Sequence, residues 1–186
     1  MLQKTSQYMR QANLIGGEWV QADSGATIDV INPATGLKLG TVPKAGRAET
    51  RRAIEAAAEA FKSWRKTSAL ERSKLLHKLA DALLDNQDTL AELLTMEQGK
   101  SLTESKGEIG SSAAYVRWFA EEGRRTYGDI VPSPWPDRRI LVKREPVGVI
   151  AAIAAWNFPS SMLAVKTGPA LAAGCTTVVK PAPQTP

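Results

Sequence analysis

The feature that most constrains this chain is a pair of short apolar segments joined by a helical stretch. Val147–Ile153 is a continuous apolar run without alternation, which is typical of a strand buried on both faces of a parallel sheet. Thr176–Val179 predicts the next buried strand. Ser160–Ala173 lies between them and predicts a helix interrupted at Gly168-Pro169. Because parallel strands need a crossover connection, we predict a right-handed β-α-β unit.

The upstream residues change from small β elements to helices. Residues 13–42 contain short extended runs broken by Gly-Gly and Asn-Pro turns, and residues 49–125 have helical periodicity. Ser68, with Glu71 three residues on, predicts a capping box at one helix start. Residues 130–136 are proline-rich and predict a connector, and residues 139–144 alternate like a strand. The apolar stripe of the capped helix is predicted to comprise Leu75, Leu76, Leu79, Leu83 and Leu84.

Charge and cysteine content exclude several classes of protein. The 24 basic residues are interleaved with 19 acidic ones, which favours a solvated mixed-charge surface over a nucleic-acid arm. No apolar run reaches the ~18 residues that would span a bilayer, and the amino terminus lacks the apolar core of a signal peptide. A single cysteine, Cys175, suits a reducing compartment. We therefore expect a cytoplasmic protein with no membrane and no nucleic-acid partner.

Two polar residues follow the predicted parallel strands. Ligands of open α/β sheets bind at the carboxyl ends of strands, where Asn157 and Lys180 stand, although no G-x-G-x-x-G fingerprint is present. The Asn157 amide could stabilise an oxyanion or could cap the next helix, and the local pattern alone favours capping. Lys180 could donate to a ribose or a phosphate, and the alternative, which the local pattern favours, is a solvated lysine.

The remaining reactive side chains favour structural interpretations. Cys175 follows Gly174 and opens an apolar strand, which predicts a buried and inert thiol. His77 is the sole histidine and lies among leucines on a predicted helix, so nothing supports a general-base role. No cluster of histidine and cysteine occurs, so we predict no metal site.

Ordered segments along the chain resemble the aldehyde dehydrogenase superfamily, and most closely its succinate-semialdehyde dehydrogenase-like members. The resemblance covers nearly the whole chain beyond the first dozen residues. The segments that carry it are Ile15–Trp19, Asn32–Gly36, Glu97–Lys100, Arg117–Gly123, Tyr127–Asp129, Glu145–Ile150, Trp156–Pro159, Gly168–Cys175, Val179–Ala182 and Gln184–Pro186.

The resemblance implies roles for particular residues. Asn157 would donate to the oxyanion of a thiohemiacetal formed on a cysteine, and Lys180 would hold the adenosine ribose of NAD or NADP. Ile153 and Trp156 would line the cofactor cleft. The family's nucleophilic cysteine and its water-activating glutamate lie downstream of these motifs. An aldehyde is the implied small-molecule substrate, oxidised to the carboxylic acid.

Four segments follow from the pattern and the resemblance together, within an α/β fold that corresponds to the amino-terminal part of an aldehyde dehydrogenase. Residues 1–12 are a loosely held leader, and residues 13–128 are the β and helical part of a cofactor domain. Residues 129–146 are a connector and an oligomerisation strand, which implies a homo-oligomer, a dimer or a tetramer. Residues 147–186 begin a Rossmann-like sheet, and their single β-α-β unit leads us to expect a fragment of a longer chain.

Two positions depart from the pattern of the family. Succinate-semialdehyde dehydrogenases typically carry an arginine for the substrate carboxylate just before a lysine, and here Val165 precedes Lys166. NAD-preferring members often have a glutamate where Pro183 stands, so a 2′-phosphate meets no repelling carboxylate. The aldehyde and the choice between cofactors stay open. The competing interpretations are a non-catalytic product that keeps only a nucleotide-binding or oligomerisation surface, and an α/β adaptor without a ligand.

Overall fold

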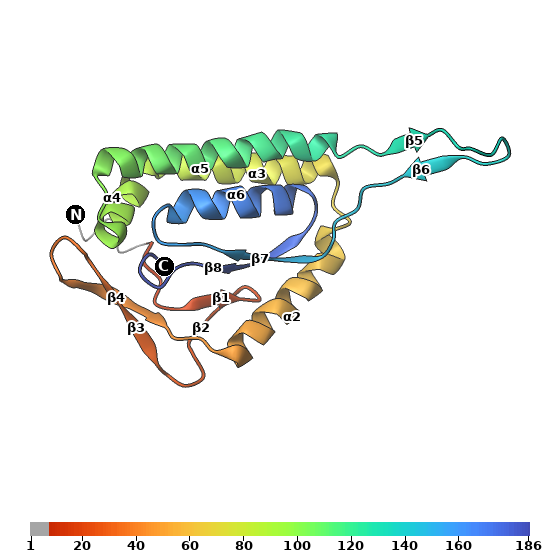
Figure 1. Ribbon diagram of the computed structural model, residues 1–186. Helices are drawn as coiled ribbons and strands as arrows, with labels where there is room; N and C mark the ends of the chain where they lie inside the picture. The colour runs from red at the N-terminus through yellow and green to blue at the C-terminus, as the bar shows by residue number, and fades with distance from the viewer. Residues whose placement is uncertain (1–7) are drawn as a thin grey trace.

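The computed structural model describes residues 8–186 as three small antiparallel hairpins, a layer of helices and one parallel strand pair (Figure 1). The strands are β1 (Asn13–Ile15), β2 (Glu18–Val20), β3 (Thr27–Ile31), β4 (Lys38–Pro43), β5 (Asp129–Val131), β6 (Ile140–Val142), β7 (Val149–Ile153) and β8 (Thr176–Lys180). The helices are α2 (Arg47–Trp64), α3 (Ala69–Asp85), α4 (Gln87–Gln98), α5 (Leu102–Glu122) and α6 (Pro159–Ala172), with a 3-10 turn at Gly123–Arg125.

The first two hairpins form where local residue chemistry demands a turn. Gly16 and Gly17 both have positive φ between β1 and β2, which is the conformation that a two-residue hairpin loop requires. Between β3 and β4, the side chain of Asn32 accepts a hydrogen bond from the Ala34 amide, and Gly36 has positive φ. The predicted Gly-Gly and Asn-Pro turns are confirmed, and each joins two antiparallel strands.

The predicted leader lies partly outside the described residues. Residues 8–11 contact the body: Tyr8 donates to the side chain of Asn86, and Gln11 accepts from Thr41 of β4. Residues 1–7 are not described.

The helical layer is held together by small side chains that let α3, α5 and α6 approach closely. Figure 1 shows α3 and α5 side by side above α6, with β7 and β8 beneath it. The predicted capping box is confirmed, since Ser68 accepts from the Glu71 amide and Glu71 accepts from the Ser68 amide. The core cluster of these three helices consists of Leu76, Ala80, Ala113, Val116, Ala120, Ala164 and Ala172.

The predicted β-α-β unit is confirmed, and two of its details were wrong. Strands β7 and β8 run parallel, with Val149 opposite Thr176 and Ile153 opposite Lys180. Helix α6 continues through Pro169 without the expected break, because Gly168 packs against Phe119 of α5 and tertiary contact outweighs the lost hydrogen bond. Strand β7 is not buried on both faces, since Ile153 is 61% exposed.

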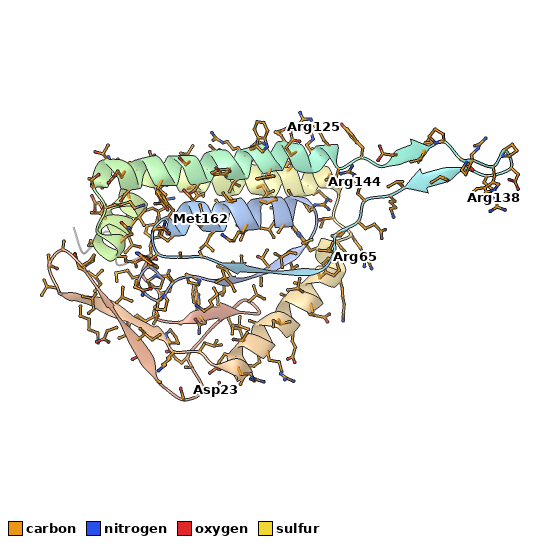
Figure 2. The ribbon with its side chains drawn as sticks, in the orientation of Figure 1. Asp23, Arg65, Arg125, Arg138, Arg144 and Met162 are labelled. Carbon is orange, nitrogen blue, oxygen red and sulfur yellow. The ribbon has the colours of Figure 1, made fainter. Side chains whose placement is uncertain are left out.

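Two further expectations about the helical region and connector were wrong. Leu75 and Leu79 are exposed, because the buried face of α3 follows Arg72, Leu76 and Ala80 at four-residue spacing. Part of the expected connector is strand β5, which pairs with β6 in a hairpin that projects from the body, with Arg138 at its far end (Figure 2). None of the helices within residues 8–186 is long and apolar enough to cross a membrane.

Candidate functional site

The carboxyl edge of the β7–β8 pair brings together four of the predicted site residues. Ile153 and Lys180 are partners in register, so their side chains lie next to each other on one face. Thr176 lies on that same face and donates to the Ala57 carbonyl of α2, which shows that α2 covers the start of the strands. Their ends are uncovered, and Lys180 is exposed. The edge therefore places an exposed apolar side chain, Ile153, next to an exposed cationic one, Lys180.

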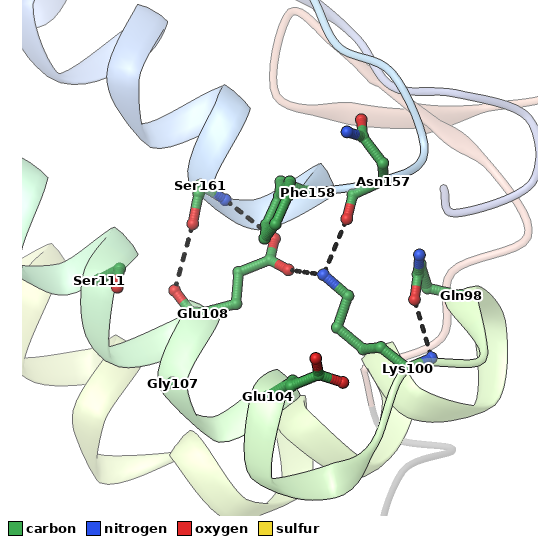
Figure 3. Close-up of a pocket in the computed structure, with 9 residues that line it drawn as sticks. All are labelled: Gln98, Lys100, Glu104, Gly107, Glu108, Ser111, Asn157, Phe158 and Ser161. Atoms are coloured by element: carbon green, nitrogen blue, oxygen red, sulfur yellow. Dashed lines mark hydrogen bonds and ion pairs between the residues drawn. The ribbon is translucent and has the colours of Figure 1, made fainter.

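Trp156 and Asn157 leave β7 at this edge. The Trp156 side chain is 57% exposed, and Asn157 is also exposed. The alternative that Asn157 caps α6 is wrong, because Phe158 occupies the N-cap position and makes no side-chain cap hydrogen bond. Within the described chain, the Asn157 amide group makes no hydrogen bond, and Figure 3 shows it turned away from Lys100 and Glu108. Its amide is thus free to meet a ligand.

A pocket of about 490 Å³ adjoins Asn157 on the side of α5 (Figure 3). Its walls come from the α4–α5 corner, from α5 and from the start of α6. The residues that line it are Gln98, Lys100, Glu104, Gly107, Glu108, Ser111, Asn157, Phe158 and Ser161. Most of these residues are polar, but the exposed wall of the pocket is largely apolar, and the Asn157 amide group points away from Lys100 and Glu108 (Figure 3).

A buried ion pair forms one wall of that pocket. The side chains of Lys100 and Glu108 are 10% and 1% exposed, and Lys100 Nζ lies 2.5 Å from Glu108 Oε2. Lys100 Nζ also donates to the backbone carbonyl of Asn157 at 2.8 Å. Glu108 Oε1 accepts from the amides of Ser160 and Ser161. These two side chains therefore contact the segment that carries Asn157.

Sequence reasoning missed this pair. Lys100 was noted only as part of the Glu97–Lys100 motif, and Glu108 was not singled out. A lysine before a helix and a glutamate two turns into it are ordinary surface residues by pattern, and only the packing of α5 on α6 buries them. One usable signal was Ser101 with Glu104, whose confirmed capping box fixes the start of α5 next to Lys100.

Glu97, in the last turn of α4, is the described acid with the most perturbed pKa. Burial raises the pKa of Glu97 from 4.5 to about 7. Its carboxyl group has no hydrogen bond or ion pair among the described residues, and the negative end of a helix further disfavours its charge. Glu97 is accordingly a protonated or half-protonated group at neutral pH.

The other singled-out residues lie away from the pocket. Cys175 is 4% exposed and precedes β8, so it lies at the opposite end of the strand from Lys180. His77 Nε2 is 2.7 Å from Glu121 Oε1 in a half-exposed pair on the helical layer. Pro183 is exposed just beyond β8, and Val165 is half-buried on α6. Residues 8–186 contain no group of acidic, histidine or cysteine side chains that could hold a metal ion.

Comparison with known proteins places these observations in a family. Residues 19–186 match the sequence profile described as "Aldehyde dehydrogenase family". The chain is 56% identical over 183 residues to a glutarate-semialdehyde dehydrogenase of Pseudomonas putida, which covers 98% of this chain and 38% of the relative. It is 54% identical to the NADP+-dependent succinate-semialdehyde dehydrogenase of Escherichia coli strain K12, covering 97% of this chain and 38% of that enzyme.

Solved structures agree with the sequence matches. A crystal structure described as an E. coli NADP-dependent enzyme superposes with a TM-score of 0.96 at 54% identity, over 97% of this chain and 38% of that one. A betaine aldehyde dehydrogenase of Staphylococcus aureus in complex with NAD+ gives a TM-score of 0.95 at 34% identity, over 98% of this chain and 37% of that one. The chain thus spans well under half of the length of these proteins.

Proposed function

This chain belongs to the aldehyde dehydrogenase family, and we propose that it supplies the cofactor edge and the oxyanion donor of an enzyme that oxidises an aldehyde to its carboxylic acid with NAD or NADP. The observation that carries the proposal is the unpaired, exposed amide of Asn157 at the carboxyl edge of a parallel strand pair, beside exposed Lys180 and Ile153. Relatives named for the oxidation of semialdehydes support the reaction class.

The residues at this edge fit a nicotinamide nucleotide. Exposed Ile153 and Trp156 offer apolar surface for a planar ring, and the Lys180 ammonium has no partner among the described residues and can donate to a ribose hydroxyl or a phosphate. A bound nicotinamide would supply the hydride acceptor. Exposed Pro183 adds no carboxylate near Lys180, so we propose that both NAD and NADP are accepted.

Asn157 is proposed to stabilise negative charge on the oxygen of the substrate. An amide N–H aimed at a developing oxyanion contributes more to the transition state than to the ground state, and is worth about 2.7–4 kcal/mol in a preorganised site. Cys175 is unsuited to be the attacking thiol, because it is buried at the other end of β8, roughly 17 Å along a five-residue strand. We propose that the nucleophile comes from outside residues 1–186.

The substrate is proposed to be a small aldehyde. Its recognition does not involve an ion pair between a substrate carboxylate and an arginine of α6. Two relatives are named for the oxidation of glutarate and succinate semialdehydes, but Val165 cannot form the bidentate pair expected in succinate-semialdehyde dehydrogenases.

We also propose that the β5–β6 hairpin joins copies of the protein. Ile130 is 80% exposed and Leu141 is 73% exposed, on a two-stranded sheet that stands apart from the core. Exposed apolar side chains on an unpaired strand edge are suited to pairing with a second chain. A homo-oligomer would cover them.

A hybrid enzyme tests the proposed function. Residues 1–186 would replace the matching segment of the E. coli succinate-semialdehyde dehydrogenase, and turnover would be followed by nicotinamide absorbance with a panel of aldehydes and both cofactors. We expect aldehyde-dependent reduction of the cofactor. A hybrid that is soluble, with the oligomeric size of the parent enzyme but without turnover, would contradict the proposal.

The Asn157→Ala variant of the hybrid isolates the key residue. We expect its kcat to fall about 10²- to 10³-fold, with the Kd for the cofactor nearly unchanged, because the amide acts on the substrate oxygen. The matched control is Asn86→Ala, a half-buried amide at the α3–α4 junction that accepts from Tyr8, which should leave kcat unaltered. An unchanged rate in Asn157→Ala would reject the oxyanion role.

A further inference from the structure

We propose that the buried Lys100–Glu108 pair is a positioning device that fixes the backbone segment carrying the free Asn157 amide, so that this amide starts from a fixed point for catalysis. The inference rests on the proposed function and adds two residues to it. Neither side chain contacts the Asn157 amide group, and both act through residues 157–161.

The ammonium of Lys100 makes three contacts, two of them with this segment. It pairs with Glu108, donates to the Asn157 carbonyl at 2.8 Å, and lies 4.1 Å from the centroid of the Phe158 ring. A cation over an aromatic face is attracted by the ring quadrupole. The Lys100 ammonium therefore contacts residues 157 and 158 on the side opposite to the exposed Asn157 amide (Figure 3).

The carboxylate of Glu108 holds the other end of the segment. Its Oε1 accepts from the Ser160 amide at 2.9 Å and from the Ser161 amide at 3.2 Å, which are in the first turn of α6. These are amides that a helix cannot satisfy internally, and α6 has no side-chain cap at Phe158. The backbone carbonyl of Glu108 also accepts from the hydroxyl of Ser112. The Glu108 carboxylate thus caps the amino terminus of α6 in place of an N-cap side chain.

Burial explains why the pair serves positioning rather than stability. Removing two charges from water costs several kcal/mol each, and well-packed apolar residues of the same volume often give equal or greater stability. Apolar side chains could not bind one carbonyl and two amides in fixed geometry. The pair is anchored on a rigid base, because the Ser101–Glu104 capping box fixes the start of α5 between Lys100 and Glu108.

Preorganisation gives this arrangement its effect on catalysis. With the carbonyl of residue 157 and the amides of residues 160 and 161 held, the intervening peptide has little freedom to rotate. A donor held in place before the reaction costs no reorganisation in the transition state, and a misplacement of about 1 Å can lower the rate by ~10²-fold.

Hydrogen–deuterium exchange and kinetics of the hybrid enzyme test the proposal together. In Lys100→Met, we expect the amides of residues 155–162 to exchange at least about tenfold faster and kcat to fall about 10- to 100-fold, while the Kd for the cofactor changes less than twofold. The matched control is Lys106→Met on α5, the helix that carries Glu108, because the ion pair of Lys106 with Asp88 is exposed. It should change none of the three: amide exchange of residues 155–162, kcat and the Kd for the cofactor.

Two further variants separate positioning from general destabilisation. The double change Lys100→Met with Glu108→Gln leaves no unpaired buried charge and keeps an acceptor for the amides of residues 160 and 161, so it should fold and still show faster exchange at residues 157 and 158. In the Asn157→Ala background, Lys100→Met should lower kcat no further, because the pair acts through that amide.

The outcomes are distinct for the two proposals. Unchanged exchange of residues 155–162 in both Lys100 variants overturns the positioning role, and so does an equal loss of kcat with and without Asn157. A hybrid that folds but never turns over aldehyde contradicts the proposed function alone, since the exchange measurement still decides whether the pair holds the segment.

Discussion

Replacing Glu97 by glutamine should raise the free energy of unfolding at pH 8 but not at pH 4, in each case relative to the unmodified chain. Burial raises the pKa of Glu97 from 4.5 to about 7 in the fold, and its carboxyl group has no partner among the described residues. Between these two values the unfolded chain binds fewer protons than the folded one. The free energy of unfolding therefore falls as pH rises through this range.

The size of the effect follows from the two pKa values. A difference between 4.5 and about 7 corresponds to a loss on the order of 3 kcal/mol between pH 4 and pH 8. Glutamine has nearly the same shape but cannot ionise, so Glu97→Gln should match the unmodified chain near pH 4 and exceed it by about 3 kcal/mol near pH 8.

Urea unfolding of the 186-residue chain followed by circular dichroism, at intervals from pH 4 to pH 8, measures this difference. Glu71→Gln is a control of opposite sign. Hydrogen bonds from the Ser68 amide and hydroxyl lower the pKa of Glu71, so its carboxylate stabilises the fold above the unfolded pKa and loses that contribution as pH falls. Parallel stability curves for Glu97→Gln and the unmodified chain would refute the reasoning.

Three further changes have definite expected outcomes. Gly99→Ala should lower the free energy of unfolding by about 1–3 kcal/mol in urea titrations, because φ is +89° and a Cβ would lie 2.8 Å from Pro33 Cγ; an unchanged midpoint would contradict this. Val165→Arg in the hybrid should raise kcat/KM for succinate semialdehyde over an uncharged aldehyde by about 10- to 100-fold, and an unaltered ratio would argue against an α6 carboxylate site. Pro183→Glu should raise the Kd for NADP at least about tenfold more than the Kd for NAD, as measured by calorimetry, since a carboxylate would repel the 2′-phosphate. An equal rise in both Kd values would place Pro183 away from the ribose.

Features set by neighbouring residues could be predicted from the sequence. The Ser68–Glu71 capping box, the Gly16-Gly17 turn and the parallel strand pair each depend on contacts within a few residues or on an uninterrupted apolar run. Short-range chemistry leaves few alternatives at such positions, so pattern alone suffices.

Features set by packing between distant segments could not be predicted. Lys100 and Asn157 are 57 residues apart in sequence, and their contact exists only because α5 packs on α6. The periodicity of α3 marked an apolar stripe but did not reveal that Leu75 lies outside the buried face. Strand β5 has three exposed residues in a proline-rich stretch, which leaves almost no signal.

The local pattern misassigned Asn157 as a helix cap, because asparagine before a helix start is common there. The resemblance to the aldehyde dehydrogenases indicated the other role, and the free side chain is compatible with it. Cys175 was interpreted from pattern alone as a buried thiol, and it is buried.

A crystal structure of the hybrid enzyme with bound NADP+ tests most directly whether Asn157 and Lys180 share one nucleotide cleft. We predict the Lys180 ammonium within hydrogen-bonding distance of the adenosine ribose and the Asn157 amide facing the space beside the nicotinamide ring. A nucleotide bound away from the carboxyl edge of β7 and β8, or an Asn157 side chain turned into the interior, would contradict the account.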